Sequence, residues 1–285
     1  NRCTFCIVTV ARGEERSRSI PELLDEIRAL RLAHYQELVL TGVHLGGYGS
    51  DQGTTLRDLI AAILQRTDVP RLRLGSLEPW DLPAGFFSLW QDPRLCPHLH
   101  LPLQSGSDTV LKRMARRCTT QRYRELIAEA RETIPNLNVT TDLIVGFPGE
   151  TGADFEQTLS FAEEIQFGHI HAFAYSPRAG TAAARMRGGL TRATRAARSA
   201  QLRALSKRLK ATHLATAVGR TATVLWERST RRLPDGRWIG SGYTPDYLRV
   251  EAHLPENHDL YNRFVDARLV RISDDGERLF AIPVQ

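Results

Sequence analysis

Two cysteines close to the start of the chain form its most reactive pair of side chains. Cys3 and Cys6 make a C-x-x-C pair, which is followed by an apolar run and then by Ala11-Arg12-Gly13. Read alone, such a pair is half of a zinc site, a redox pair or half of an iron–sulfur site. No second pair follows at zinc spacing, and a β-branched run rather than a helix start comes after Cys6, which weighs against zinc and a thioredoxin-like pair. Cys96 and Cys118 stand alone and are interpreted as structural.

Polar or glycine-rich turns follow several apolar runs further along the chain. These turns are Thr41–Gly46, Ser76–Pro79, Gln104–Ser107 and Gly146–Glu150. In parallel α/β folds the carboxyl ends of the strands line the ligand site, so we expect the four turns to converge on one mouth. Their glycines also have a plain role, because glycine permits tight turns.

The elements that must position these residues alternate between short apolar strands and amphipathic helices. The expected strands are Phe5–Val10, Glu37–Leu40, Arg71–Leu74, His98–Leu101, Val139–Val145 and His169–Ala174. The expected helices are Ile20–Leu32, Leu56–Arg66, Thr109–Met114, Gln121–Thr133 and Asp154–Ile165. Six strand–helix repeats predict an α/β fold with a parallel sheet, either a partial six-stranded (β/α)6 barrel or a doubly wound open sheet.

A different pattern occupies the last part of the chain. Its five expected strands are Thr221–Trp226, Arg237–Tyr243, Tyr247–Val250, Phe264–Arg271 and Leu279–Ile282. They predict a small five-stranded all-β barrel, OB-like, which is a common nucleic-acid-binding architecture. Before it, the stretch from Arg185 to Val218 holds nine Lys and Arg and no Asp or Glu. We interpret this stretch as contacting a polyanion such as RNA rather than as a merely solvated helix face.

Composition limits the class of protein further. Of the 285 residues, 42% are hydrophobic and 25% are charged, as in ordinary globular proteins. No apolar run approaches the roughly 20 residues of a spanning helix. We therefore expect a cytoplasmic protein without a membrane segment.

The cysteine pair resembles part of the radical-SAM motif C-x-x-x-C-x-x-C, with the usual aromatic, Phe5, before its last cysteine. Cys3 and Cys6 would be its second and third cysteines, and the first would lie two positions before Asn1. Four further segments resemble radical-SAM methylthiotransferases, in the same order along the chain. They are Glu37–Gly46, Leu99–Ser107, Thr140–Glu150 and Tyr175–Thr181. One departure is Thr9-Val10, where that family commonly has Pro-Tyr.

This resemblance implies a site and its chemistry. Three thiolates hold a [4Fe-4S] cluster and leave one iron free for the amino and carboxylate groups of S-adenosylmethionine, which one electron then cleaves to a 5′-deoxyadenosyl radical. The implied ligands of the cluster are Cys3 and Cys6, and the implied S-adenosylmethionine contacts are Thr41, Gly42, Val43, Glu78, Gln104, Ser105, Asp142 and Gly146. Asp142 and Glu78 have an alternative role as capping or ion-paired acids. No catalytic residue is assigned, and His98 and His100 are expected to be packed or hydrogen bonded.

The segment Gly242–Val250 resembles the TRAM domain, in the form found in enzymes that methylthiolate N6-threonylcarbamoyladenosine beside the tRNA anticodon. The RNA-binding candidates are Arg195, Arg198, Lys207, Tyr243 and Arg249. Replacing Arg195, Arg198 and Lys207 together is expected to weaken tRNA binding and flatten its salt dependence. Tyr247 either stacks on a base or fills the barrel core.

The resemblance therefore implies a radical-SAM catalytic domain over residues 1–190, a basic helical linker over 191–216 and a TRAM domain over 217–285. It implies methylthiolation at C2 of the modified adenosine in tRNA, with electrons from a flavodoxin or ferredoxin. A second [4Fe-4S] cluster in an N-terminal domain outside this chain would deliver sulfur, so the chain alone is expected not to insert sulfur. Alternatives are an enzyme acting on isopentenyladenosine in tRNA or on a ribosomal protein, and a non-catalytic RNA-binding protein.

Overall fold

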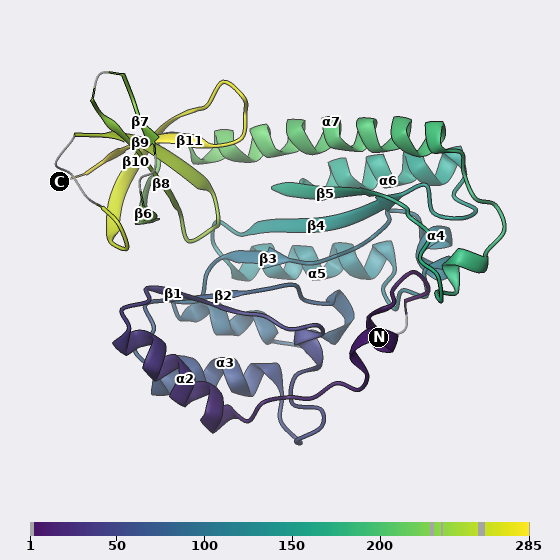
Figure 1. Cartoon of the computed structure of the whole chain (residues 1–285), viewed down its shortest axis with the longest axis horizontal. Helices are drawn as coiled ribbons and strands as arrows, with labels where there is room; N and C mark the ends of the chain where they lie inside the picture. The colour runs from purple at the N-terminus through teal and green to yellow at the C-terminus, as the bar shows by residue number, and fades with distance from the viewer. Residues whose placement is uncertain (1–2, 229–230, 235, 256–259, 285) are drawn as a thin grey trace.

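The computed structural model describes residues 3–228, 231–234, 236–255 and 260–284. It contains a parallel α/β domain and a smaller all-β barrel, each built around its own apolar core (Figure 1). The expected fold class is thereby confirmed. No helix in this part of the chain is long and apolar enough to cross a membrane.

Parallel strands form an incomplete barrel in the first domain. They are β1 (Glu37–Leu40), β2 (Arg71–Leu74), β3 (His98–His100), β4 (Asn138–Val145) and β5 (His169–Ala174). β1 pairs with β2, and β3, β4 and β5 pair in that order. Single bridges from Leu72 to Leu95 and from Ser76 to His100 connect the two groups. The strands therefore follow one another in chain order, as successive strand–helix repeats require.

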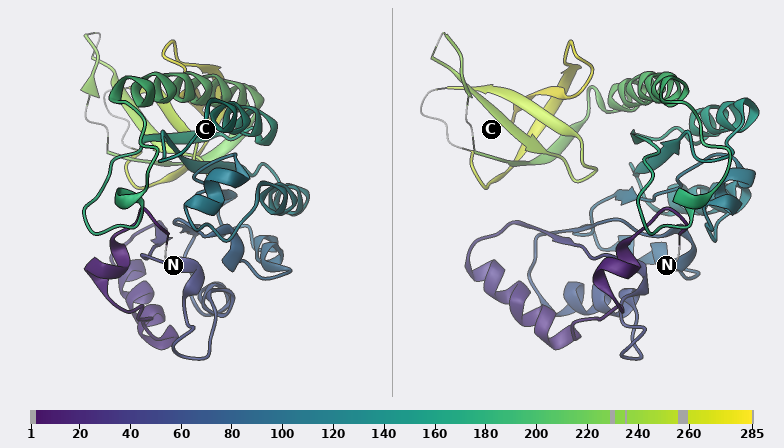
Figure 2. Two further views of the ribbon diagram at one scale, coloured as in Figure 1. Left: turned by 90° about the vertical axis from the view of Figure 1, so that its right-hand side faces the viewer. Right: turned by 45° about the vertical axis from the view of Figure 1, so that its right-hand side comes forward.

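Helices cover the outer face of these strands (Figure 2). The α-helices are α1 (Val8–Arg12), α2 (Ile20–Leu32), α3 (Leu56–Arg66), α4 (Asp108–Arg113), α5 (Thr120–Thr133), α6 (Gly152–Ile165) and α7 (Arg192–Ala217). Short 3-10 helices are η1 (Leu45–Gly47), η2 (Pro79–Asp81), η3 (Phe86–Gln91) and η4 (Ala183–Arg185). Capping boxes at Ser19, Thr55 and Thr151 fix the starts of α2, α3 and α6.

The expected first strand, Phe5–Val10, is wrong. The segment forms the short helix α1, which one backbone bond from Ala11 N to Ile7 O (3.0 Å) closes. Gly13 ends the helix at a φ of +73°. The β-branched residues favour a strand locally, but no neighbouring strand pairs with this segment within the described residues, so tertiary context decides. The described parallel strands therefore number five rather than six.

Helix α7 connects the two domains and contributes side chains to the apolar core of each. Its residues Leu202, Leu205 and Leu209 lie in the core of the α/β domain. Leu214 and Ala217, about two turns further on, lie in the core of the small barrel. The basic stretch therefore packs against the first domain and also connects it to the small barrel.

The C-terminal domain is a closed five-stranded barrel. Its strands are β6 (Thr221–Trp226), β8 (Trp238–Tyr243), β9 (Arg249–Leu254), β10 (Phe264–Ile272) and β11 (Leu279–Pro283), with a two-residue strand β7 (Arg231–Arg232) beside β8. The order β6-β10-β11-β9-β8 closes because β8 also pairs with β6. Closure leaves no long free edge in the main barrel.

Two arginines on β2 dock the small barrel onto the α/β domain. Arg71 donates to the backbone oxygens of Thr223 (2.9 Å) and Tyr243 (3.2 Å), and Arg73 donates to that of Pro245 (3.0 Å). Both arginines are buried. Because a buried carbonyl needs a donor, these bonds fix the position of the small barrel.

Further polar contacts lie in the same interface. Asn138, at the start of β4, donates from Nδ2 to the backbone oxygen of Asp246 (2.8 Å), and the Asp246 carboxylate is 2.5 Å from Arg220. The small barrel thus lies at the amino ends of the parallel strands. The N-terminal segment lies at the other end (Figures 1 and 2).

Candidate active site

The N-terminal cysteine segment is held at the carboxyl ends of the strands. Thr4 N donates to Met114 O (3.0 Å), and Ala183 N donates to Thr4 O (2.9 Å). The Phe5 ring packs edge-on against Phe147, in the turn after β4, at 6.4 Å between centroids. These contacts place both cysteines at the mouth to which the polar turns lead.

Both thiols at this mouth are free and partly exposed. Arg116 Nη1 lies 3.6 Å from Cys3 Sγ, and the backbone N of Val8 donates to Cys6 Sγ (3.4 Å). Two partly exposed thiols on one short loop, each with an N–H group beside its sulfur atom, fit two ligands of an iron–sulfur cluster.

Arg116 is a residue of this site that the sequence reasoning missed. Its guanidinium is 3.0 Å from the Glu78 carboxylate, lies over the Trp80 ring at 4.2 Å and also donates to the backbone oxygen of Pro102. Arg116 thereby connects the Cys3 loop to the turn after β2. No sequence signal points to it, because it follows helix α4 as one of several arginines.

The turn after β1 presents exposed backbone to the mouth. Thr41, Gly42 and Val43 are all exposed, as expected for a segment that receives a ligand. His44, which sequence reasoning also left unassigned, anchors this turn. Its Nε2 is 2.5 Å from Asp81, and its Nδ1 is 2.9 Å from Glu15.

These two carboxylates give His44 a pH-dependent role. Hydrogen bonding to Asp81, then to Glu15, raises the pKa of His44 from 6.5 to about 9 against the opposing effect of burial. A raised folded-state pKa stabilises the fold fully below the unfolded value of about 6.5, and this contribution is lost as pH rises through about 9. His44→Gln is therefore expected to lower the Tm near neutral pH and to shrink the fall of Tm between neutral and alkaline pH. Thermal unfolding across that range measures both, and an unchanged pH dependence would contradict this role.

Gln104 and Ser105 differ in what they can contact. Gln104 has a φ of +79°. Its backbone N donates to Asp142 O (2.9 Å) and its backbone O accepts from Ile144 N (2.9 Å), so it pairs with β4. Ser105 is fully buried, and its Oγ lies 3.3 Å from Thr158 Oγ1. The Ser105 side chain therefore fixes the turn onto α6, and the contact of Ser105 with S-adenosylmethionine stays a prediction.

Asp142 and Gly146 lie at different depths in the parallel barrel. Asp142 is inside β4, and its Oδ1 is 3.4 Å from His100 Nε2, so its carboxylate faces the barrel lumen below the mouth. Gly146 follows β4 with a φ of +74°, and its N donates to Glu150 Oε1 (2.9 Å). A Cβ at Gly146 would collide with the Arg195 side chain.

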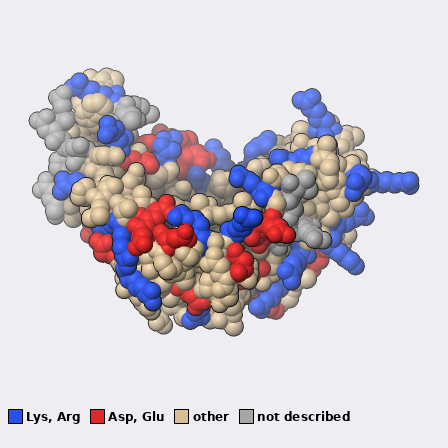
Figure 3. All heavy atoms as spheres, turned by 60° about the horizontal axis from the view of Figure 1, so that its bottom comes forward, with Lys and Arg blue, Asp and Glu red and all other residues tan. Residues whose placement is uncertain are grey.

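Two of the RNA-binding candidates on α7 are engaged inside the protein. Arg198 forms an ion pair with the buried Glu150, and Arg195 Nη1 donates to Tyr175 O (3.2 Å). The ion pair with Glu150 makes Arg198 hold the turn after β4, and its expected contact with RNA stays a prediction. Lys207 is exposed. On the face shown in Figure 3, basic and acidic side chains are interspersed.

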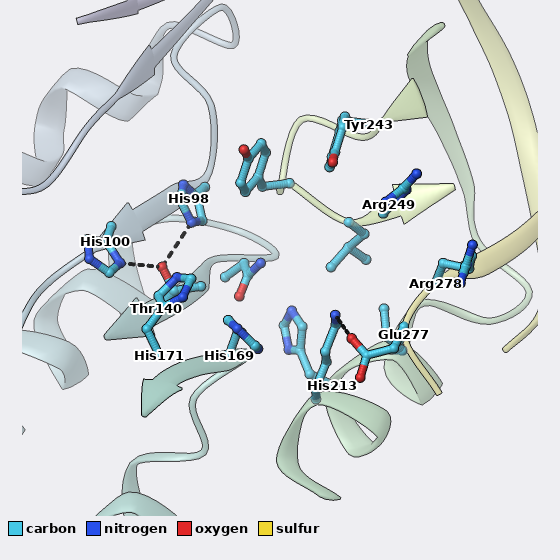
Figure 4. Close-up of a pocket in the computed structure, with 16 residues that line it drawn as sticks. His98, His100, Thr140, His169, His171, His213, Tyr243, Arg249, Glu277 and Arg278 are labelled. Carbon is cyan, nitrogen blue, oxygen red and sulfur yellow. Dashed lines mark hydrogen bonds and ion pairs between the residues drawn. The ribbon is translucent and has the colours of Figure 1, made fainter. Parts of the chain in front are cut away.

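The tyrosines of the small barrel line a cavity of about 390 Å³ between the two domains. Figure 4 shows Tyr243 and Arg249 on one side of it and histidines of β3 and β5 on the other. Tyr243 and Tyr247 stack at 4.9 Å between centroids. Arg73 also lies over the Tyr247 ring at 4.4 Å, so Tyr247 is part of the domain interface while remaining 45% exposed. Arg249 is exposed.

A parallel α/β barrel with paired thiols at its mouth defines the class of protein. The family model of the Radical SAM superfamily matches residues 1–162, and the chain belongs to this superfamily. The match includes Cys3 and Cys6 and strands β1 to β4.

Curated relatives give a more specific comparison than the superfamily match. The chain is similar to the threonylcarbamoyladenosine tRNA methylthiotransferase MtaB of Thermotoga maritima, at 37% identity over 88% of this chain and 57% of that protein. It is also similar to the tRNA-2-methylthio-N(6)-dimethylallyladenosine synthase of Bacillus velezensis, at 40% identity over 90% of this chain and 50% of that protein. The resemblance to tRNA methylthiotransferases is confirmed. The chain spans about half the length of these relatives.

Solved structures support the fold alone. Coproporphyrinogen III oxidase (HemN) from Escherichia coli matches with a TM-score of 0.52 at 12% identity, covering 100% of this chain and 69% of that chain. The radical S-adenosylmethionine methyltransferase TsrM from Kitasatospora setae matches with a TM-score of 0.51 at 16% identity, covering 61% of this chain and 34% of that chain.

Proposed function

We propose that the full-length protein is a radical-SAM methylthiotransferase that adds a methylthio group to C2 of N6-threonylcarbamoyladenosine next to the tRNA anticodon. The observation that carries the proposal is the location of Cys3 and Cys6 at the mouth of the parallel barrel, with Arg116 beside one thiol. The similarity to a threonylcarbamoyladenosine tRNA methylthiotransferase supports the substrate.

Each residue at the mouth has its own role in this proposal. Cys3 and Cys6 would hold a [4Fe-4S] cluster, which would supply the electron that cleaves S-adenosylmethionine. Arg116 lies beside the Cys3 sulfur, and Glu78 holds Arg116 in place. The exposed backbone of Thr41, Gly42 and Val43 binds the methionine end of S-adenosylmethionine.

Apolar residues beside the mouth exclude water, and the small barrel at the opposite ends of the strands binds the partner. Buried Phe147 and Tyr175, with Phe5 against them, form an apolar wall beside the cysteines. A dry site protects a reactive intermediate from side reactions. The small barrel serves as a TRAM domain that binds tRNA through Tyr243 and Arg249, with Lys207 on α7 contributing charge. A second cluster, held in a further domain, would supply the sulfur, and a flavodoxin or ferredoxin would supply the electrons.

A second candidate substrate is dimethylallyladenosine in tRNA, because a synthase of its 2-methylthio form is 40% identical to this chain. Mass spectrometry of tRNA nucleosides from a strain lacking the full-length protein separates the two. We expect loss of the methylthio form of threonylcarbamoyladenosine, accumulation of its unmodified precursor, and restoration by the wild-type gene but not by Cys3→Ala. Loss of the dimethylallyl derivative instead would assign the second substrate, and an unchanged nucleoside profile would overturn both.

A further inference from the structure

A row of polar side chains lines the lumen of the parallel barrel. Alternate residues of a strand point to the same face, so His98 and His100 of β3, and likewise His169 and His171 of β5, point into the lumen. Thr140 of β4 lies between His98 and His100, with its hydroxyl 3.1 Å and 2.9 Å from their ring nitrogens (Figure 4).

Three of the side chains in the lumen lie close together at the same height along the barrel. Strand register places Asp142 opposite His171 and Thr140 opposite His100. One nitrogen of His100, one nitrogen of His171 and one carboxylate oxygen of Asp142 lie within 4.8 Å of one another. No other group of three or more such residues converges in this way among the described parts of the chain.

The His100 ring is held in the orientation that a metal ligand needs. Its Nδ1 is 2.9 Å from Thr140 Oγ1, and its Nε2 points to Asp142 at 3.4 Å. A metal-binding histidine commonly has its second nitrogen fixed by such a hydrogen bond. Thr140 therefore supplies the outer contact, and Asp142 supplies an adjacent oxygen ligand.

We propose that His100, Asp142 and His171 bind a divalent transition-metal ion of the zinc type in the barrel lumen. Two imidazoles and one carboxylate are a usual three-ligand set for zinc, and they leave a position open for water or an oxygen ligand. For three atoms that are at most 4.8 Å apart, there is a point within about 2.8 Å of all three. Small side-chain rotations therefore reach zinc bond lengths of about 2.0–2.2 Å.

The open position of this ion is reachable. His100 and His171 both line the cavity of about 390 Å³ between the domains, which also receives Lys210 and Arg249. Lys210 is paired with Glu277 there, so Arg249 is the cation that favours an anionic oxygen ligand, such as a carboxylate or phosphate, at the open position. The site uses none of the cysteines at the mouth, so zinc binding can be tested in a protein that lacks the cluster. Asp142 is the one ligand that the family resemblance also implies for S-adenosylmethionine.

Zinc binding to the whole chain tests the site. In a Cys3→Ser/Cys6→Ser background, which removes zinc capture at the mouth, we expect one zinc per chain after equilibration with buffered zinc. His100→Ala, Asp142→Asn or His171→Ala is expected to weaken zinc affinity at least tenfold. His253→Ala is the matched control, because His253 is an exposed histidine on β9 of the small barrel. Circular dichroism verifies that each variant folds.

X-ray absorption at the zinc edge identifies the ligands. The site predicts nitrogen and oxygen neighbours with imidazole scattering and no sulfur. Equal zinc affinity in the His171→Ala variant and its parent, or sulfur in the first coordination sphere, would overturn the assignment. So would the absence of bound zinc at micromolar free zinc in the folded parent.

Discussion

Cys3→Ala and Cys6→Ala, each made in the full-length protein, are expected to lose nearly all bound iron and sulfide after anaerobic reconstitution. Each thiolate would be one of three cluster ligands, so no spare ligand replaces it. The loss of cluster affinity is expected to exceed the roughly 10–100-fold that follows from changing a group that only orients a metal ligand. Formation of 5′-deoxyadenosine from S-adenosylmethionine should fall to the level of the cluster-free protein.

Cys118→Ala is the control for both variants. Cys118 is buried, and burial raises the pKa of its thiol to about 11, so it is a poor thiolate ligand. This variant is expected to keep its iron and sulfide. A Cys3→Ala protein with the full iron content of the wild type would contradict the ligand assignment.

Arg73→Met is expected to destabilise the folded protein by about 3 kcal/mol. Removing one partner of a buried ion pair typically costs about 3–5 kcal/mol, because the other charge stays buried and uncompensated. Arg73 contacts Glu37 at 2.9 Å and also donates to Pro245 O in the small barrel. The lower end of the range applies because Arg71 remains 3.6 Å from Glu37.

Urea unfolding measures this loss, and limited proteolysis reports whether the small barrel has come loose. Arg28→Met is the matched control, because Arg28 and Asp25 form an exposed pair, which typically contributes about 0–1 kcal/mol. Arg73→Met/Glu37→Leu removes both charges and is expected to recover part of the stability. A loss for Arg73→Met no larger than that for Arg28→Met would refute the docking role.

Much of the fold follows from local sequence signals. Helices Ile20–Leu32 and Leu56–Arg66 were predicted from apolar periodicity with the bounds that the structure shows, and capping boxes fix their starts in the structure. The five strands of the small barrel were also predicted, one with the bounds that the structure shows and the others with shifts of up to four residues at their ends. The segment 5–10 failed because β-branched residues favour a strand only where a neighbouring strand pairs with them.

The candidate site was predicted less completely, since its contacts join residues far apart in the chain. Motifs marked Cys3 and Cys6, but nothing in the sequence connects Arg116 to Cys3 across 113 positions. Basic composition suggested that Arg198 binds RNA, whereas its partner is the buried Glu150. Charge counts cannot separate an arginine that faces solvent from one that neutralises a buried acid.

The most direct measurement of the central claim is electron–nuclear double resonance on the reduced full-length protein with S-adenosylmethionine labelled with ¹⁵N at its amino group. If Cys3 and Cys6 hold a cluster with one iron open to S-adenosylmethionine, the label will couple to the cluster spin, and the coupling will vanish in Cys3→Ala. A cluster signal that S-adenosylmethionine leaves unchanged would contradict the account.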